Sequence, residues 1–155
     1  MDLIPYLRQI HQDFTDQANL QNIQFIFHTE AENLLCWFDG RQLRKVLTNL
    51  LSNAFKHKPE KGKIELSITD KGDSIYIKVI DSGKGIPSKA LPFIFDRFYQ
   101  ADENFSSPGS GIGLALSKGI VELHHGQIEV QSAIDYGSIF TVILPVSYTH
   151  LRAHE

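Results

Sequence analysis

Residues 41–58 read RQLRKVLTNLLSNAFKHK, and this stretch predicts an amphipathic helix at the centre of the fold. Because helical residues advance by about 100° each, apolar side chains three and four positions apart form one stripe that packs into a core. The stripe consists of Leu43, Val46, Leu47, Leu50, Leu51, Ala54 and Phe55. Asp39 is a candidate N-cap before the first turn, and Pro59 and Gly62 are expected to end the helix.

The opposite face of this helix is polar and carries Lys45, Asn49, Asn53 and Lys56, with His57 nearby. An ordinary solvated surface is the simplest interpretation of such a stripe. Asparagine is a weak helix former, however, so two asparagines one turn apart are unexpected on a face selected only for solubility. The polar face is therefore a candidate site that needs a partner elsewhere in the chain.

The length and composition favour a single globular domain. A chain of 155 residues with 42% apolar and 21% charged residues has enough material for one core. Its net charge of −3 argues against nucleic-acid binding, and its single cysteine, Cys36, cannot form an internal disulfide. No apolar run approaches the roughly 20 residues that cross a bilayer, so no direct membrane contact is expected. The histidine spacings do not match a zinc site.

The segments around the central helix predict one layer of helices on one sheet. Helical spacing occurs in residues 5–19 and 114–124. Apolar or alternating runs predict strands at residues 23–27, 34–38, 64–68, 75–79, 128–132 and 138–144. The expected fold class is α+β: a two-layer sandwich with a mixed, mostly antiparallel sheet of about five strands and about three helices on one face.

Two glycine clusters follow elements of this fold. Residues 81–86, DSGKGI, come directly after a predicted strand, and residues 109–113, GSGIG, open a predicted helix. Glycines at the start of a helix expose backbone N–H groups and the positive end of the helix dipole, which together form the outline of a phosphate site. The spacings do not fit the Walker loop, the Rossmann fingerprint or the glycine loop of eukaryotic protein kinases.

Four short motifs, taken in order, resemble the catalytic, ATP-binding domain of two-component sensor histidine kinases. NLLSNAFK at 49–56 resembles the N box, DSGKGI at 81–86 the first glycine box, FDRFY at 95–99 the phenylalanine box and GSGIGL at 109–114 the second glycine box. Residues 120–145 resemble the closing part of the family, and the likeness is greatest to kinases of the hybrid type. It implies a Bergerat ATP-binding fold over residues 1–145, whereas 146–155 are expected to be an artificial, read-through or disordered tail.

The resemblance also implies which residues bind Mg-ATP. Asn53 would bind Mg²⁺ through its amide oxygen and, with Lys56, would take part in catalysis. Asp81 would accept a hydrogen bond from the adenine amino group, and residues 100–108 would form a lid over the nucleotide. Thr141 either adds a polar contact near adenine or is a tolerated core threonine. The full implied nucleotide site is Asn49, Asn53, Lys56, His57, Asp81, Gly83, Gly85, Ile86, Phe98, Gly109, Gly111, Ile112, Gly113, Leu114 and Thr141.

The implied activity is transfer of the ATP γ-phosphoryl group to histidine, within a two-component phosphorelay. The acceptor would lie on dimerisation helices outside this chain, because His11 and the other histidines lack the family's acceptor setting. The partners implied are those helices and a response regulator, in the cytoplasm, with the isolated chain a monomer.

Three other interpretations remain open at this stage. The first is a gyrase- or chaperone-like ATPase; those enzymes resemble this fold but carry a glutamate base at the position of Asn49. The second is a nucleotide-binding docking module without catalysis. The third is a scaffold in which the glycines are only turns.

Overall fold

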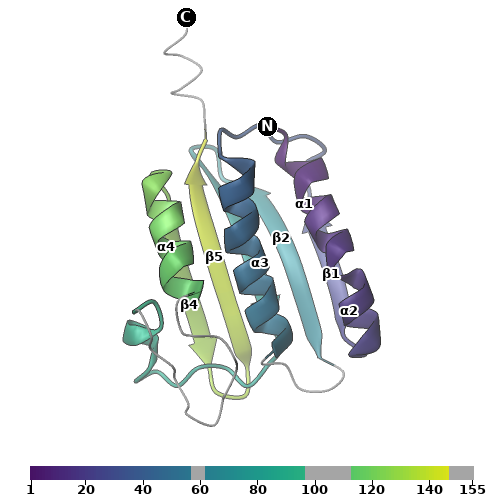
Figure 1. Cartoon of the computed structure of the whole chain (residues 1–155), viewed down its shortest axis with the longest axis vertical. Helices are drawn as coiled ribbons and strands as arrows, with labels where there is room; N and C mark the ends of the chain where they lie inside the picture. The colour runs from purple at the N-terminus through teal and green to yellow at the C-terminus, as the bar shows by residue number, and fades with distance from the viewer. Residues whose placement is uncertain (57–61, 97–112, 147–155) are drawn as a thin grey trace, which may run out of the picture.

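The computed structural model describes residues 1–56, 62–96 and 113–146, and it shows helices on one face of an open five-stranded sheet (Figure 1). The elements are α1 (Leu3–Asp13), α2 (Thr15–Leu20), β1 (Gln24–Thr29), α3 (Gly40–Lys56), β2 (Lys63–Asp70), β3 (Ser74–Asp81), the 3-10 turn η1 (Leu91–Phe93), α4 (Gly113–Leu123), β4 (Gln127–Ala133) and β5 (Gly137–Pro145). The predicted α+β sandwich is confirmed.

The strand order is β1-β2-β3-β5-β4, with β1 parallel to β2 and every other pair antiparallel. Alternate side chains of a strand point to opposite faces. On β3 the residues that face the helices are buried, and the last of them is Asp81. Asp81 pairs with Ser138 of β5, and Ser138 pairs with Ser132 of β4, so these three polar residues form one row on the helix face.

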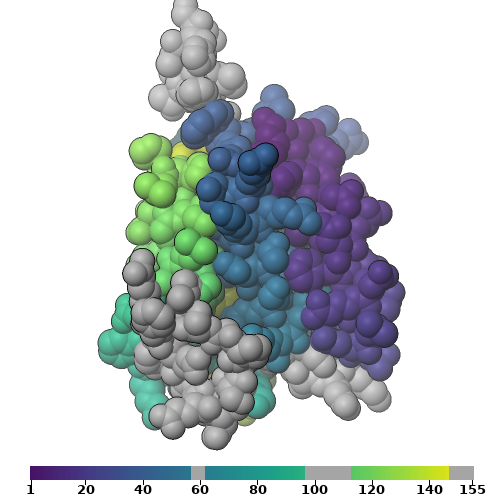
Figure 2. Space-filling model, in the orientation of Figure 1, coloured from purple at the N-terminus to yellow at the C-terminus, as the bar shows by residue number. Residues whose placement is uncertain are grey.

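The central helix α3 forms as the sequence predicts. All seven residues of its apolar stripe are buried, from Leu43 to Phe55. Asp39 caps the first turn, because its carboxylate accepts a hydrogen bond of 2.9 Å from the Arg41 N–H. The predicted stop at Pro59 lies outside the described residues. The helices form a continuous layer over this face of the sheet, with α3 between α1 and α4 (Figure 2).

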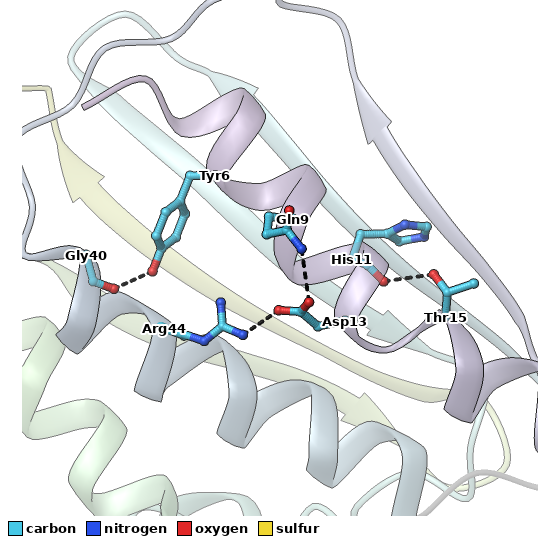
Figure 3. Close-up of polar contacts among 7 residues, drawn as sticks. All are labelled: Tyr6, Gln9, His11, Asp13, Thr15, Gly40 and Arg44. Carbon is cyan, nitrogen blue, oxygen red and sulfur yellow. Dashed lines mark hydrogen bonds and ion pairs between the residues drawn. The ribbon is translucent and has the colours of Figure 1, made fainter.

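Polar contacts as well as apolar packing join α1 to α3 (Figure 3). The Tyr6 hydroxyl donates to the carbonyl oxygen of Gly40. One turn later on α3, Arg44 forms an ion pair with Asp13, which also accepts a hydrogen bond from Gln9. These contacts hold α1 against one side of α3. The other side of α3 faces α4.

Two predicted elements differ in the structure. The helix expected at 5–19 breaks at Phe14, because the Thr15 hydroxyl donates to the His11 carbonyl oxygen at 3.1 Å and competes with the helical bonding pattern. The strand expected at 34–38 does not form, and the segment contributes only an isolated bridge between Asp2 and Leu35. Its apolar alternation is real, since Leu34, Cys36 and Phe38 are buried, but no strand of the described residues pairs with it.

Among the described residues, no helix is both long enough and apolar enough to cross a membrane.

Candidate functional site

Most of the described residues of the predicted site gather at one end of the sandwich. At this end β3 finishes, β5 begins, α3 finishes and α4 begins, at the bottom of the view in Figure 1. Asp81 is the last residue of β3, Gly113 is the first of α4 and Lys56 is the last of α3. The fold thus brings to one end of the sandwich motifs that lie far apart in the chain.

Asp81 is a buried carboxylate, with 9% of its surface exposed. One of its oxygens, Oδ1, accepts a hydrogen bond of 2.8 Å from the Gly83 N–H. Burial raises the pKa of Asp81, while hydrogen bonding from the backbone of Gly83 and Ser138 opposes the rise. An ionised carboxylate has about four lone-pair positions, so Asp81 retains capacity to accept further hydrogen bonds.

The loop after Asp81 lies directly against the turn between β4 and β5. Gly85 has a φ of +77°, and a Cβ there would stand 1.9 Å from the carbonyl oxygen of Ala133. The Asp135 N–H donates to the Lys84 carbonyl oxygen at 2.7 Å, which closes the contact. The family resemblance implies that Gly85 belongs to the nucleotide site, and the structure gives a separate reason for a glycine at this position: the hairpin backbone occupies the space of its side chain.

Gly137 makes the reciprocal contact from the hairpin. Its φ is +94°, and a Cβ there would stand 1.9 Å from the Asp81 carbonyl oxygen. A side chain at either glycine would therefore separate the loop from the hairpin.

Asn49 connects α3 to the start of α4. Its Nδ2 donates to the Gly113 carbonyl oxygen at 3.3 Å and to the Ser117 hydroxyl at 3.2 Å. Ser117 is completely buried. Since an amide nitrogen has two hydrogens, both are used, and only Oδ1 of Asn49 remains for a ligand.

We predict that Asn49→Asp destabilises the fold, because a carboxylate has no hydrogen to donate to the Gly113 carbonyl. A partly buried carboxylate that faces this carbonyl oxygen, acceptor against acceptor, costs about 1–3 kcal/mol, which lowers the melting temperature of a domain of this size by roughly 3–10 °C. Thermal unfolding at pH 7 measures this effect. Gln42→Glu is the matched control, since it makes the same amide-to-carboxylate change near the start of α3, where the helix dipole favours an acid. Equal melting temperatures for the two variants would contradict the proposed link between the helices.

Other predicted residues surround these groups. Asn53 lies one turn beyond Asn49 and is half-buried, whereas Lys56 is exposed at the end of the helix. Ile86 and Leu114 are partly buried against the core. Gly83 is buried within the loop.

Thr141 is separated from Asp81. It pairs with Lys78 and Glu129, and the alternation along β5 places it on the face of the sheet opposite Asp81 and Ser138. We therefore assign Thr141 no part in the site. Sequence reasoning missed Ser138. A signal was available, because alternation along a strand places residues 138 and 141 on opposite faces of the sheet, so only one of them can share a face with Asp81.

Five predicted residues, His57, Phe98, Gly109, Gly111 and Ile112, lie outside the described residues, as does the predicted lid at 100–108. Within residues 1–56, 62–96 and 113–146, no group of three or more His, Cys, Asp or Glu side chains forms a metal cluster.

Comparison with known families gives a match over most of the chain. The sequence profile described as "Histidine kinase-, DNA gyrase B-, and HSP90-like ATPase" matches residues 38–148. The chain is 37% identical to Histidine kinase P4 of Formosa agariphila, across 99% of this chain and 12% of that protein. It is 37% identical to the adaptive-response sensory kinase SasA of Thermosynechococcus vestitus, across 90% of this chain and 38% of that protein. The chain therefore spans less than two fifths of either relative.

Solved structures agree with this match. The nucleotide-free catalytic domain of histidine kinase ThkA has a TM-score of 0.83 at 28% identity, covering 93% of this chain and 94% of that domain. Full-length ShkA in complex with AMPPNP has a TM-score of 0.84 at 26% identity, covering 94% of this chain and 30% of ShkA. ThkA in complex with the response regulator TrrA has a TM-score of 0.80 at 27% identity, covering 94% of this chain and 41% of ThkA.

Proposed function

Because the chain belongs to the histidine kinase-, DNA gyrase B- and HSP90-like ATPase family and is homologous to sensor histidine kinases, we propose that it is the Mg-ATP-binding catalytic domain of such a kinase. It transfers the γ-phosphoryl group of ATP to a histidine on a separate helical domain. The observation that carries the proposal is the buried carboxylate of Asp81, which stands beside a glycine loop at the same end of the fold as the polar face of α3.

Asp81 supplies the specificity for adenine. The Gly83 N–H holds Oδ1 of the carboxylate in place, and the remaining lone pairs accept from the exocyclic amino group of the base. Guanine presents a carbonyl oxygen at that position, which a carboxylate repels. Burial strengthens this discrimination, because an unmade hydrogen bond is costlier where water cannot replace it.

The phosphates lie between the end of α3 and the start of α4. Asn53 offers a hard oxygen to Mg²⁺, and Lys56 offers a positive charge to the phosphate oxygens. The first turn of α4, an 11-residue helix, exposes backbone N–H groups near Gly113 and Leu114. Mg²⁺ held by Asn53 would supply positive charge against the phosphates, while Asn53 and Lys56 orient the γ-phosphoryl group.

The chemistry at Asn49 favours kinase activity over ATP hydrolysis. A hydrolase must take a proton from water, and an amide whose two hydrogens are bound to Gly113 and Ser117 cannot act as that base. A histidine acceptor is largely neutral at pH 7 and needs no base. The partners that follow are the acceptor helices and a response regulator, since the similar protein ThkA has been captured with one. We place the domain in the cytoplasm, where ATP is available, and expect a monomer in isolation.

Phosphoryl transfer tests the proposal. The full chain is mixed with labelled ATP, Mg²⁺ and the phosphoacceptor helix domain of its parent kinase, and we expect an acid-labile, base-stable phosphate on that domain. Asn53→Ala is expected to slow the transfer by about 100-fold, because misplacing a reacting phosphoryl group costs on that order. Asn19→Ala, the same change at an exposed position of α2, is the matched control and should retain the wild-type rate.

The other outcomes of this experiment are informative. Rapid phosphate release without transfer would indicate the gyrase- or chaperone-like ATPase. Nucleotide binding with neither transfer nor release would indicate a docking module. Label on the chain without the acceptor domain would contradict the proposed division between the two domains.

A further inference from the structure

Ser132 is outside every motif that identified the site, yet its hydroxyl forms hydrogen bonds with the glycine loop between Asp81 and Pro87 and with the β4–β5 turn. The Ile86 N–H donates to Ser132 Oγ at 2.7 Å. Ser132 Oγ also lies 2.9 Å from the Gly137 carbonyl oxygen and 2.8 Å from Ser138 Oγ. The side chain therefore connects the loop after β3 to both sides of the β4–β5 turn.

The direction of each of these hydrogen bonds follows from the chemistry of a hydroxyl, which has one hydrogen and two lone pairs. A carbonyl oxygen only accepts, so Ser132 donates its hydrogen to Gly137. Its lone pairs then accept from the Ile86 N–H and from the Ser138 hydroxyl. The hydrogen and both lone pairs of the Ser132 hydroxyl are thus used. The Ser138 hydroxyl donates its hydrogen to Ser132, so it can only accept hydrogen bonds from other groups.

These bonds complete the attachment of the loop between Asp81 and Pro87. Near its start, the Gly83 N–H binds the Asp81 carboxylate. In its middle, the Lys84 carbonyl accepts from the Asp135 N–H at 2.7 Å. At its end, the Ile86 N–H binds Ser132. Without Ser132 the loop loses the attachment nearest the side chain of Ile86.

We propose that Ser132 is a positioning residue for adenine recognition: its hydroxyl fixes the end of the glycine loop against the β4–β5 turn and so holds the surface on which the base lies beside Asp81. The inference rests on the proposed function for its ligand, but the contact itself exists without nucleotide. It assigns to the hairpin a role in binding that none of the four motifs includes.

The first measurement is made without ligand. Amide hydrogen exchange by NMR on the full chain should show a protected Ile86 N–H in the wild type. Ser132→Ala should lose this protection by about ten-fold or more, as expected for one hydrogen bond, and Ser132→Thr, which keeps the hydroxyl, should restore it. Equal protection in the wild type and Ser132→Ala would overturn the proposal, whether or not the chain binds nucleotide.

The second measurement is calorimetric titration of ADP and GDP. Ser132→Ala should weaken ADP binding by about ten-fold with little change for GDP, and Ser132→Thr should recover most of the loss. Ser67→Ala is the control, since Ser67 is a buried serine of the same sheet on the opposite face.

A double-mutant cycle separates positioning from general destabilisation. In an Asp81→Asn background, adding Ser132→Ala should weaken ADP binding by less than about three-fold, because the interaction that Ser132 positions is already absent. Additive effects would overturn the proposal. Failure of the wild type to prefer ADP over GDP would instead overturn the proposed function, and the exchange result would still decide whether Ser132 holds the loop.

Discussion

Asp81→Asn is expected to weaken ADP binding by about 10- to 100-fold without lowering the stability of the ligand-free fold. The amide retains one oxygen, which continues to accept from the Gly83 N–H at 2.8 Å, and removal of the buried charge offsets the weaker bonding to the Ser138 backbone. Its NH₂ group then faces the amino group of adenine, donor against donor. The expected loss corresponds to a charged hydrogen bond of about 1.5–3 kcal/mol. Calorimetric titration with ADP and Mg²⁺ measures it.

The effect of Asp81→Asn on stability follows from the raised pKa of Asp81 in the wild type, which burial causes. A carboxyl group whose pKa is higher in the folded than in the unfolded state binds its proton more tightly when folded. The ligand-free protein should therefore gain stability at low pH and lose it as the pH rises from the ordinary value of 3.8 through the raised folded value. Asparagine does not titrate, so Asp81→Asn should remove this part of the pH dependence.

Two melting series between about pH 3.5 and 7 check this sign, one for the wild type and one for Asp81→Asn. The wild type should lose stability relative to the variant as the pH rises. Asp135→Asn is a matched control, because Asp135 is an exposed carboxylate on the adjacent turn.

If Asp81→Asn bound ADP as tightly as the wild type, the assignment of the base to this carboxylate would be wrong.

The sequence predicted the fold where one periodicity dominates a long segment. The apolar stripe of α3 and the alternation in β2 and β3 leave little choice of face, because a shift of one residue would expose the whole apolar set. The motif residues Asp81 and Gly113 lie at the same end of the sandwich, because one ends β3 and the other begins α4.

The sequence was less informative where a contact between segments decides the local structure. The run at 34–38 has strand-like alternation but no partner strand within the described part of the chain, and pairing cannot be read from one segment. The break at Phe14 depends on a local hydroxyl bond of Thr15. Ser132 showed no signal in its own segment, because its role depends on a loop 46 residues earlier in the chain.

Gly85→Ala is expected to disrupt the site more severely than any substitution of a polar side chain in the loop. The new Cβ would stand 1.9 Å from the Ala133 carbonyl oxygen and 3.1 Å from the Ile134 Cα, both of them backbone atoms. The loop must therefore move away from the hairpin, which breaks the 2.7 Å bond between the Lys84 carbonyl and the Asp135 N–H. A displacement of about 1 Å at a binding surface can cost roughly 100-fold, so ADP binding should fall by that order.

Gly72→Ala is the control that separates the effect of the contact between loop and hairpin from the effect of backbone strain. Gly72 has a φ of +91°, similar to the +77° of Gly85, but among the described residues no atom lies within 4 Å of the position that a Cβ would take there. Both variants incur the left-handed penalty of about 1–2 kcal/mol, which should lower both melting temperatures. Only Gly85→Ala should show a further loss of stability together with the loss of ADP binding. If the two variants bound ADP equally well, the contact between loop and hairpin would have no part in recognition. Gly85 would then be explained by its backbone conformation alone.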